Sequence, residues 1–209
     1  MFMQNQKDFA VATNAAAMID LEAVMFPAAL TRSGLIEGTR VEAADGWRAV
    51  ETLMRGDAVY TLDGGLRQIT AIHRKDVLPA RALRVPGGAL DNCSEITLLP
   101  GQHVLVEDDR AEDVFGSPLA MIPAAALAGY RGIEWLNWQG AKAEIVTLEF
   151  EEEEVVYANT GMLLHCPEAS QLALPRPISK FFNVLAMADA REMVALMNDA
   201  GAADFAQVA

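Results

Sequence analysis

The spacing of hydrophobic and polar positions changes near residue 39. Before that point, residues 8–26 form an amphipathic pattern that stops at Pro27, which predicts one helix. From Thr39 onward, short runs of Val, Ile, Leu, Thr and Tyr are broken by turn residues, as is typical of strands joined by hairpins. The predicted strands are residues 39–43, 47–51, 58–62, 66–73, 82–85, 95–99, 103–107, 119–122, 132–138, 144–150 and 155–158.

Few helices are predicted among these strands. Pro123 opens one short helix over residues 124–128, which Gly129 closes. A parallel sheet would need a helix after nearly every strand, so we predict an antiparallel, mainly β body. After several prolines, a second helix is predicted around residues 189–198, with Gly201 as its stop and its apolar stripe docked on the domain.

These patterns divide the chain into three parts. We expect an N-terminal helical arm over residues 1–32, a β domain over residues 33–170 and a C-terminal helical appendage over residues 171–209. With 52% hydrophobic residues in 209, the chain has enough apolar material for one core.

Composition excludes several classes of partner. The formal charge is −13 and no run of Lys and Arg occurs, so nucleic acid and anionic membrane surfaces are not expected partners. No secretory signal and no membrane-spanning stretch is recognisable, and two cysteines cannot form a disulfide framework. We therefore expect a cytoplasmic protein. Three scattered histidines and the lack of any nucleotide-binding motif predict neither a metal site nor a cofactor.

Three blocks in fixed order carry a more specific signal. The first runs from Gly34 to Thr61: it reads GLIEGTRV, then a glycine turn, then GWRAVE, and ends with Gly-Asp before a strand. The second is LPGQHVLV at residues 99–106, and the third is EVVYANTG at residues 154–161. In this order they resemble the bacterial branch of the Hint domains, the Hedgehog/intein autoprocessing fold, over roughly residues 34–170.

The resemblance implies a fold of curved, intertwined antiparallel hairpins with an ancestry in self-processing. In that family the first residue is Cys, or occasionally Ser or Thr, and it attacks the preceding carbonyl. The matching position is Gly34, four residues before Gly38, and glycine has no side chain with which to attack. The nucleophile position is therefore substituted in this chain.

His103 matches the family histidine that activates the scissile amide. The family usually places Thr or Ser three residues earlier, whereas this chain has Pro100 there and Thr97 further off. The resemblance makes His103 and Thr97 candidate catalytic residues, with the hydroxyl partner displaced.

The chain contains other candidate nucleophiles besides position 34. Ser33 could attack the carbonyl of Arg32 by an N-to-O acyl shift, with His103 as the acid, and release residues 1–32. His165 and Cys166 resemble an intein ending, but the Asn required between them is absent and Asn159 lies six residues before His165. A cysteine-protease pairing of Cys166 with His103 has no supporting signature.

Three functions remain open at this point. The favoured one is a Hint-domain protein that lacks standard cysteine-dependent self-cleavage and acts as a folded binding module for its own N-terminal segment or for an unidentified protein. The alternatives are an active domain that cleaves after Arg32 and an unrelated β-rich interaction protein.

Overall fold

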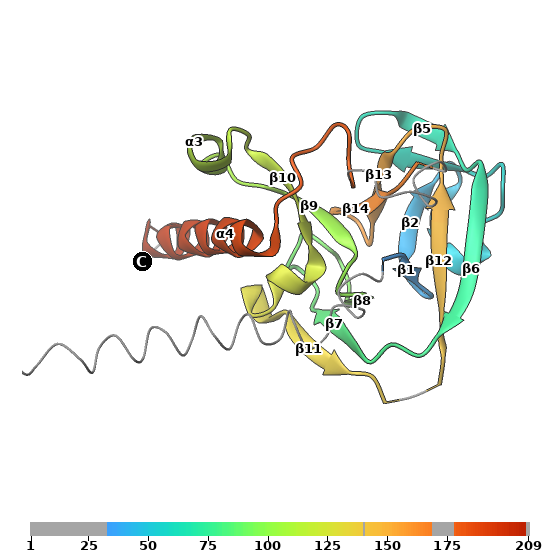
Figure 1. Ribbon diagram of the computed structural model, residues 1–209, viewed down its shortest axis with the longest axis horizontal. Helices are drawn as coiled ribbons and strands as arrows, with labels where there is room; N and C mark the ends of the chain where they lie inside the picture. Colours follow the sequence, from blue (N-terminus) through green and yellow to red (C-terminus); the bar gives the residue numbers. More distant parts are fainter. Residues whose placement is uncertain (1–32, 140, 169–177, 208–209) are drawn as a thin grey trace, which may run out of the picture.

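The computed structural model describes residues 33–139, 141–168 and 178–207 (Figure 1). The predicted arm, including its helix over residues 8–26, lies outside the described residues. The β domain and the appendage are described apart from residues 140, 169–177 and 208–209.

The largest sheet has eight strands, and all of its ladders are antiparallel. Its order is β10-β9-β14-β13-β2-β4-β5, with β3 paired to β2. The strand bounds are β2 Arg40–Ala43, β3 Gly46–Ala49, β4 Ala58–Thr61, β5 Gly65–Gln68, β9 His103–Glu107, β10 Leu119–Pro123, β13 Glu154–Ala158 and β14 Met162–Cys166.

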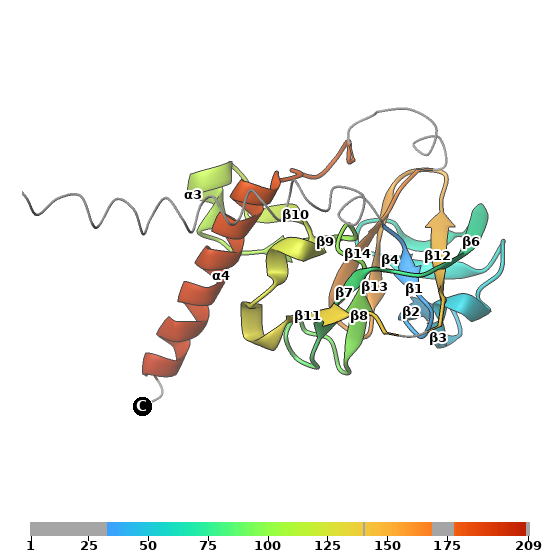
Figure 2. The same ribbon diagram turned by 60° about the horizontal axis from the view of Figure 1, so that its bottom comes forward.

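Two three-stranded sheets complete the β body, which confirms a mainly β, antiparallel fold. One has the order β1-β12-β6 and the other β11-β7-β8. Their bounds are β1 Leu35–Ile36, β6 Ala71–Val77, β7 Arg81–Val85, β8 Ile96–Leu98, β11 Glu134–Asn137 and β12 Ala143–Glu149. Figures 1 and 2 show β12 and β6 lying side by side, with β1 beside β12.

The prediction of one strand over residues 66–73 is wrong. The chain forms β5 and β6 instead, because its two halves pair with different partners. Ile69 donates its N–H to the Asp57 carbonyl, whereas the N–H of Thr70 bonds the Glu149 carbonyl on β12. The bend at this point transfers the chain from one sheet to another. The strands β1 and β14 had no predicted counterpart.

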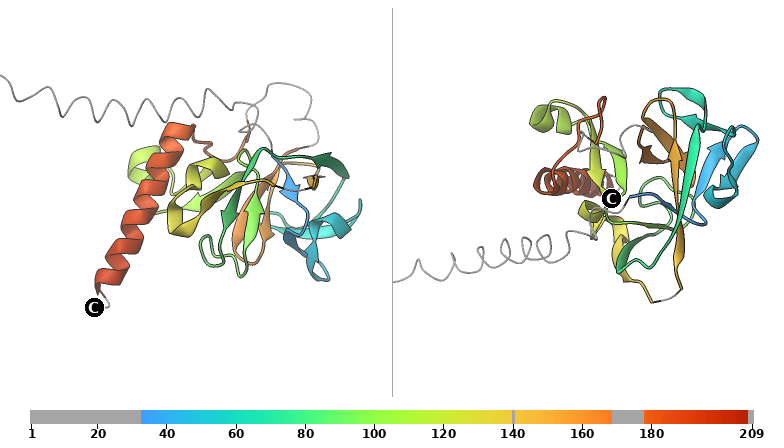
Figure 3. Two further views of the ribbon diagram at one scale, coloured as in Figure 1. Left: turned by 90° about the horizontal axis from the view of Figure 1, so that it is seen from below. Right: turned by 45° about the vertical axis from the view of Figure 1, so that its right-hand side comes forward.

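Helices contribute little to the body. The described helices are η1 Val50–Thr52, α3 Ala111–Phe115, η2 Ala124–Leu127, η3 Tyr130–Gly132 and α4 Met187–Gln207. The helix predicted over 124–128 is a 3₁₀ helix, and α4 continues past Gly201, which is therefore not its stop. Figure 3 shows the C-terminal part of α4 projecting from the β body.

The predicted docking of the second helix is confirmed in its first half. Ala190, Met193, Val194 and Met197 of α4 are buried in the main core. That core also takes the inward residues of the eight-stranded sheet, among them Val41 and Leu164. Burying apolar area at roughly 25 cal/mol per Å² holds the helix to the body. No helix in the described part of the chain is long and apolar enough to cross a membrane.

Candidate functional site

Gly34 lies immediately before β1 in a conformation that only glycine adopts readily. Its φ is +125°, and a Cβ built there would stand 2.6 Å from Ile145 Cγ2 and 3.3 Å from Thr147 Oγ1. Both neighbours belong to β12, which pairs with β1. A side chain at position 34 would therefore need both an unfavourable backbone conformation and a shift of the Ile145 side chain on β12.

The amide of Gly34 is held by a buried side chain that the sequence analysis did not single out. Gln102 Oε1 accepts the Gly34 N–H at 2.9 Å. Gln102 Nε2 donates to the carbonyl oxygens of His103 and His165, at 3.0 and 2.9 Å. One amide group thus joins the start of the domain to the end of β14, and it offers Gly34 an acceptor rather than a proton donor.

His103 opens β9, as predicted, and is half-buried. Burial lowers the pKa of its imidazole, and a hydrogen bond to the Gly101 backbone opposes that effect. The imidazole is therefore neutral near pH 7, the protonation state of a base rather than of an imidazolium acid. The hydrogen on the Gly34 nitrogen is donated to the neighbouring Gln102, not to His103.

His165 faces His103 across two adjacent strands. The ladder between β14 and β9 pairs Leu163 with Leu105, and continuing that register sets His165 opposite His103. Their ring centroids are 6.4 Å apart in an edge-to-face arrangement. His165 is buried, and its Nε2 has no hydrogen-bond partner. Burial lowers the pKa of His165 to about 4; the charge of Glu153 raises it and that of His103 lowers it further.

The remaining predicted residues lie apart from this pair. Ser33 is exposed, directly before Gly34. Thr97 lies in β8 opposite Arg84, in a different sheet from His103. The structure thus brings Gly34, Gln102 and the two histidines together, while Thr97 belongs to a separate strand pairing.

The two cysteines have different surroundings. Cys166 is buried, and burial raises the pKa of its thiol to about 12. Cys93 is exposed, and hydrogen bonds with Thr160 and Ser94 lower the pKa of its thiol. Asn159 is buried and structurally committed: its side chain accepts the Arg40 N–H and donates to Ser94 Oγ.

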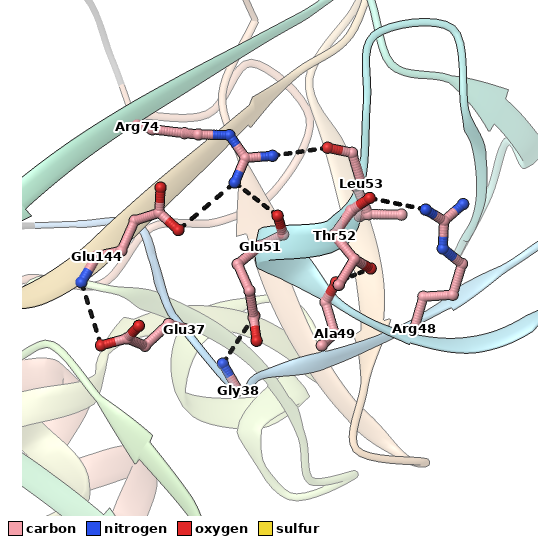
Figure 4. Close-up of polar contacts among 9 residues, drawn as sticks. All are labelled: Glu37, Gly38, Arg48, Ala49, Glu51, Thr52, Leu53, Arg74 and Glu144. Atoms are coloured by element: carbon pink, nitrogen blue, oxygen red, sulfur yellow. Dashed lines mark hydrogen bonds and ion pairs between the residues drawn. The ribbon is translucent and has the colours of Figure 1, made fainter.

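A polar network supports the turn that follows β1 (Figure 4). Glu51 Oε2 accepts the Gly38 N–H at 2.8 Å. Arg74 on β6 donates to the carbonyl oxygens of Glu51 and Leu53, both at 2.7 Å, and forms an ion pair with Glu144 at 3.5 Å. The network ties η1 to β6 and β12 and so fixes the course of the chain between Gly34 and Gly38.

Among the described residues, no group of three or more His, Cys, Asp or Glu side chains could hold a metal ion. His103 and His165 form a pair without a third ligand of that kind. Within the described ranges, the chemistry at this place is that of two imidazoles, a carboxamide and backbone amides.

Comparison with known proteins identifies the family. The family model of the Hint domain matches residues 33–163, which is more than half of the chain. The chain therefore belongs to the Hint-domain family and has an autoprocessing ancestry. No curated protein matches it.

Several solved structures are similar to the chain at low sequence identity. A bacterial intein-like domain from Clostridium thermocellum is 13% identical with a TM-score of 0.48, covering 64% of this chain and 99% of its own. The AceL NrdHF class 3 split intein, as a splice-inactive variant, is 12% identical with a TM-score of 0.44, covering 65% and 98%. The gp41-1 intein is 14% identical with a TM-score of 0.39, covering 63% and 98%.

Proposed function

We propose that this chain is a Hint domain that has lost standard cysteine-dependent self-cleavage and acts as a folded binding module. The observation that carries the proposal is the environment of Gly34, because a Cβ there would stand 2.6 Å from Ile145 Cγ2. The space that a nucleophilic side chain would need is filled by the side chains of Ile145 and Thr147 on β12. Such a site does not regain its chemistry by one substitution.

Two further features support the loss of cleavage. Expulsion of the Gly34 nitrogen requires a proton donor, whereas its N–H is donated to Gln102 Oε1. At the other end of the domain, Cys166 stands beside His165 where an intein would carry Asn, and its thiol is buried. Neither end of the Hint domain has the groups that a thioester or a succinimide would need.

The partner that we propose first is the chain's own N-terminal segment. Residues 1–32 are joined covalently to Ser33, which is exposed directly beside Gly34. A tethered segment reaches a nearby surface at an effective concentration in the millimolar range. An unidentified protein is the alternative partner. The cytoplasm remains our proposed location, supported by two cysteines that are both free thiols.

Intact mass tests the loss of cleavage. Full-length protein is incubated at pH 7 with and without hydroxylamine, and we expect one species at the full mass of 22.5 kDa in both samples. A fragment beginning at Ser33 would support the alternative of cleavage after Arg32, and Ser33→Ala should then remove it. A fragment that appears with wild-type protein therefore overturns the proposal.

Photo-crosslinking tests the partner. A photoreactive residue at the exposed Glu37, three positions after Gly34, should crosslink to residues 1–32 of the same chain. The matched control is Asp45, which is exposed in the turn between β2 and β3. Crosslinks to residues 1–32 from both positions, or from neither, contradict a segment seated beside Gly34.

A further inference from the structure

A C-terminal stretch, Ser179–Leu185, lies outside the region matched by the Hint family and is anchored at its start by a buried carboxylate. Glu153, just before β13, accepts hydrogen bonds from Ser179 Oγ and from the backbone N–H groups of Lys180 and Phe181. Charge-assisted bonds of this kind are about twice as strong as neutral ones. Glu153 thus fixes one end of the stretch beside β13.

The other end is anchored on β10. Met121 donates its N–H to the Asn183 carbonyl at 2.8 Å, and its carbonyl accepts the Leu185 N–H at 3.0 Å. Val184 forms a parallel bridge with Met121 at this edge. Figures 1 and 2 show the stretch running from the neighbourhood of β13, past β10, to the start of α4.

Between its anchors the stretch has to cross two strands. The strands β13, β14, β9 and β10 are consecutive neighbours, and Asn183–Leu185 pairs with the free edge of β10, so β14 and β9 lie between the two anchors. Ser179 Oγ also accepts the backbone N–H groups of Phe181 and Phe182, so residues 179–182 form a turn beside Glu153. The stretch therefore begins with a turn at Glu153 and then crosses the strands to the edge of β10, where Asn183 and Leu185 bond Met121.

The histidine pair lies on the face of the sheet against which this stretch packs. Residues that are paired in register lie on the same face of the sheet. On one face, a first row across the strands holds Leu163, Leu105 and Met121. The next row on that face holds Val155, His165, His103 and Pro123. Glu153 lies beyond the second row and Met121 lies in the first, so the two anchors stand on either side of the row that holds the histidines. Phe182 and Val184 pack against Leu105, Met121 and Val155, which places them on this face.

We propose that Ser179–Leu185 is a strap that keeps the pair of imidazoles on β9 and β14 from solvent and reactants, and that its release exposes a two-histidine site. The inference goes beyond the proposed binding function and does not depend on it. The unpartnered, buried Nε2 of His165 supports it, because a buried polar atom without a partner is costly and gains one when water is admitted. The titratable groups that act on this imidazole are His103 from β9 and Glu153, just before β13. Lys180, in the strap, pairs with Glu168.

Chemical modification of histidine tests the strap in the full chain. Diethyl pyrocarbonate acylates neutral imidazole, and His73, whose side chain is 58% exposed, is an internal reference. In the wild type we expect His165 to react at least about tenfold more slowly than His73, because it reacts only when the strap opens. Mass spectrometry of the peptides gives both rates.

Two substitutions in the contacts of the strap, each with a control at the neighbouring residue, separate opening of the strap from a general loss of stability. Glu153→Ala removes the anchor and Phe182→Ala removes the packed ring, and each should raise the reactivity of His165 about tenfold relative to His73. The controls are Glu152→Ala and Phe181→Ala, because both side chains are exposed, Phe181 by 68%. The controls should leave the ratio unchanged.

The outcomes are decisive even if one variant fails to fold, because the two strap variants act through different contacts. Circular dichroism selects the folded variants. Wild-type His165 that reacts as fast as His73 overturns the proposal. So does a His165 that stays protected in each folded strap variant, or one that is exposed equally by the controls.

Discussion

The backbone N–H of Gly34 lies 2.9 Å from the side-chain oxygen of Gln102, across 68 positions of sequence. The same side chain bonds two carbonyl oxygens near the ends of β9 and β14. Gln102 is therefore the group that closes the β body at the point where the N-terminal segment joins it. Replacing Gln102 with leucine keeps the approximate size of the side chain and removes its hydrogen-bonding groups, so its contribution to stability can be measured.

Gln102→Leu should destabilise the domain by about 3 kcal/mol, because one buried and two partly buried backbone groups lose their partner. A buried polar group left without a partner costs roughly 1–3 kcal/mol, and water reduces this cost for the two that are partly buried. Urea unfolding followed by circular dichroism measures the change. The control is Gln68→Leu, because Gln68 is exposed on β5 and its loss should fall within about 0.5 kcal/mol. Equal effects of the two substitutions would show that Gln102 is not a buried clamp.

Gly34→Ala should destabilise the protein by about 3 kcal/mol, part from backbone strain and part from the contact with Ile145 Cγ2. Gly46→Ala isolates the strain, because Gly46 has a φ of +113° and nothing within 4 Å of an added Cβ. In an Ile145→Leu background, which lacks the Cγ2 methyl, the cost of Gly34→Ala should fall by about 1 kcal/mol. Identical costs at the two glycines would remove the steric argument for the loss of the nucleophile.

Sequence reasoning worked best where local pattern decides structure. The apolar run Val104–Val106 after His103 predicts a strand over residues 103–107, and β9 has those bounds. The split of residues 66–73 was missed because both halves have strand character, and only the change of partner at Thr70 breaks them apart. A local pattern carries no information about which sheet a strand joins.

The site was harder to predict than the fold. Gly34 was singled out by its block, but its acceptor is a glutamine without any motif of its own, and their contact depends on long-range closure of the domain. The importance of His165 depends on the register of β14, a strand that the sequence did not predict because its residues include no β-branched side chain. The sequence of Ser179–Leu185 has neither a helical nor a strand periodicity, so no element is predicted there.

Arg74→Met should cost about 1–2 kcal/mol in urea unfolding, because the guanidinium is the donor to the carbonyl oxygens of Glu51 and Leu53. The effect should include faster hydrogen exchange at the Gly38 amide, which Glu51 holds. Lys75→Met is the control, since Lys75 is exposed on the same strand. An unchanged exchange rate at Gly38 would show that the contacts of Arg74 with η1 do not stabilise the turn after β1.

Stability should fall with acid between pH 6.5 and 4 because of His165. Its pKa is about 4 in the folded chain against an ordinary 6.5, so the unfolded chain binds more protons in this window and stability rises with pH. The loss of stability reaches about 3 kcal/mol below pH 4. It is absent above pH 6.5, where His165 is neutral in both the folded and the unfolded chain.

His165→Gln removes this titration, so urea unfolding across that range should give a flatter profile for the variant. The residual slope includes His103, whose pKa is also lowered by burial, and the carboxylates of the acidic chain. A His165→Gln profile parallel to that of the wild type would contradict a buried neutral imidazole.

The two thiols should differ sharply toward a disulfide reagent such as Ellman's reagent. In native protein at pH 8 we expect one fast equivalent from Cys93, because it is exposed and hydrogen bonds with Thr160 and Ser94 lower its pKa. Cys166 should react only after unfolding, because its thiol is buried and its pKa is about 12. Cys93→Ser should abolish the fast phase, and Cys166→Ser should leave it intact. A second fast equivalent in the wild type would mean that the end of β14 is open to solvent, and that Cys166 is available for the nucleophilic chemistry which its burial otherwise prevents.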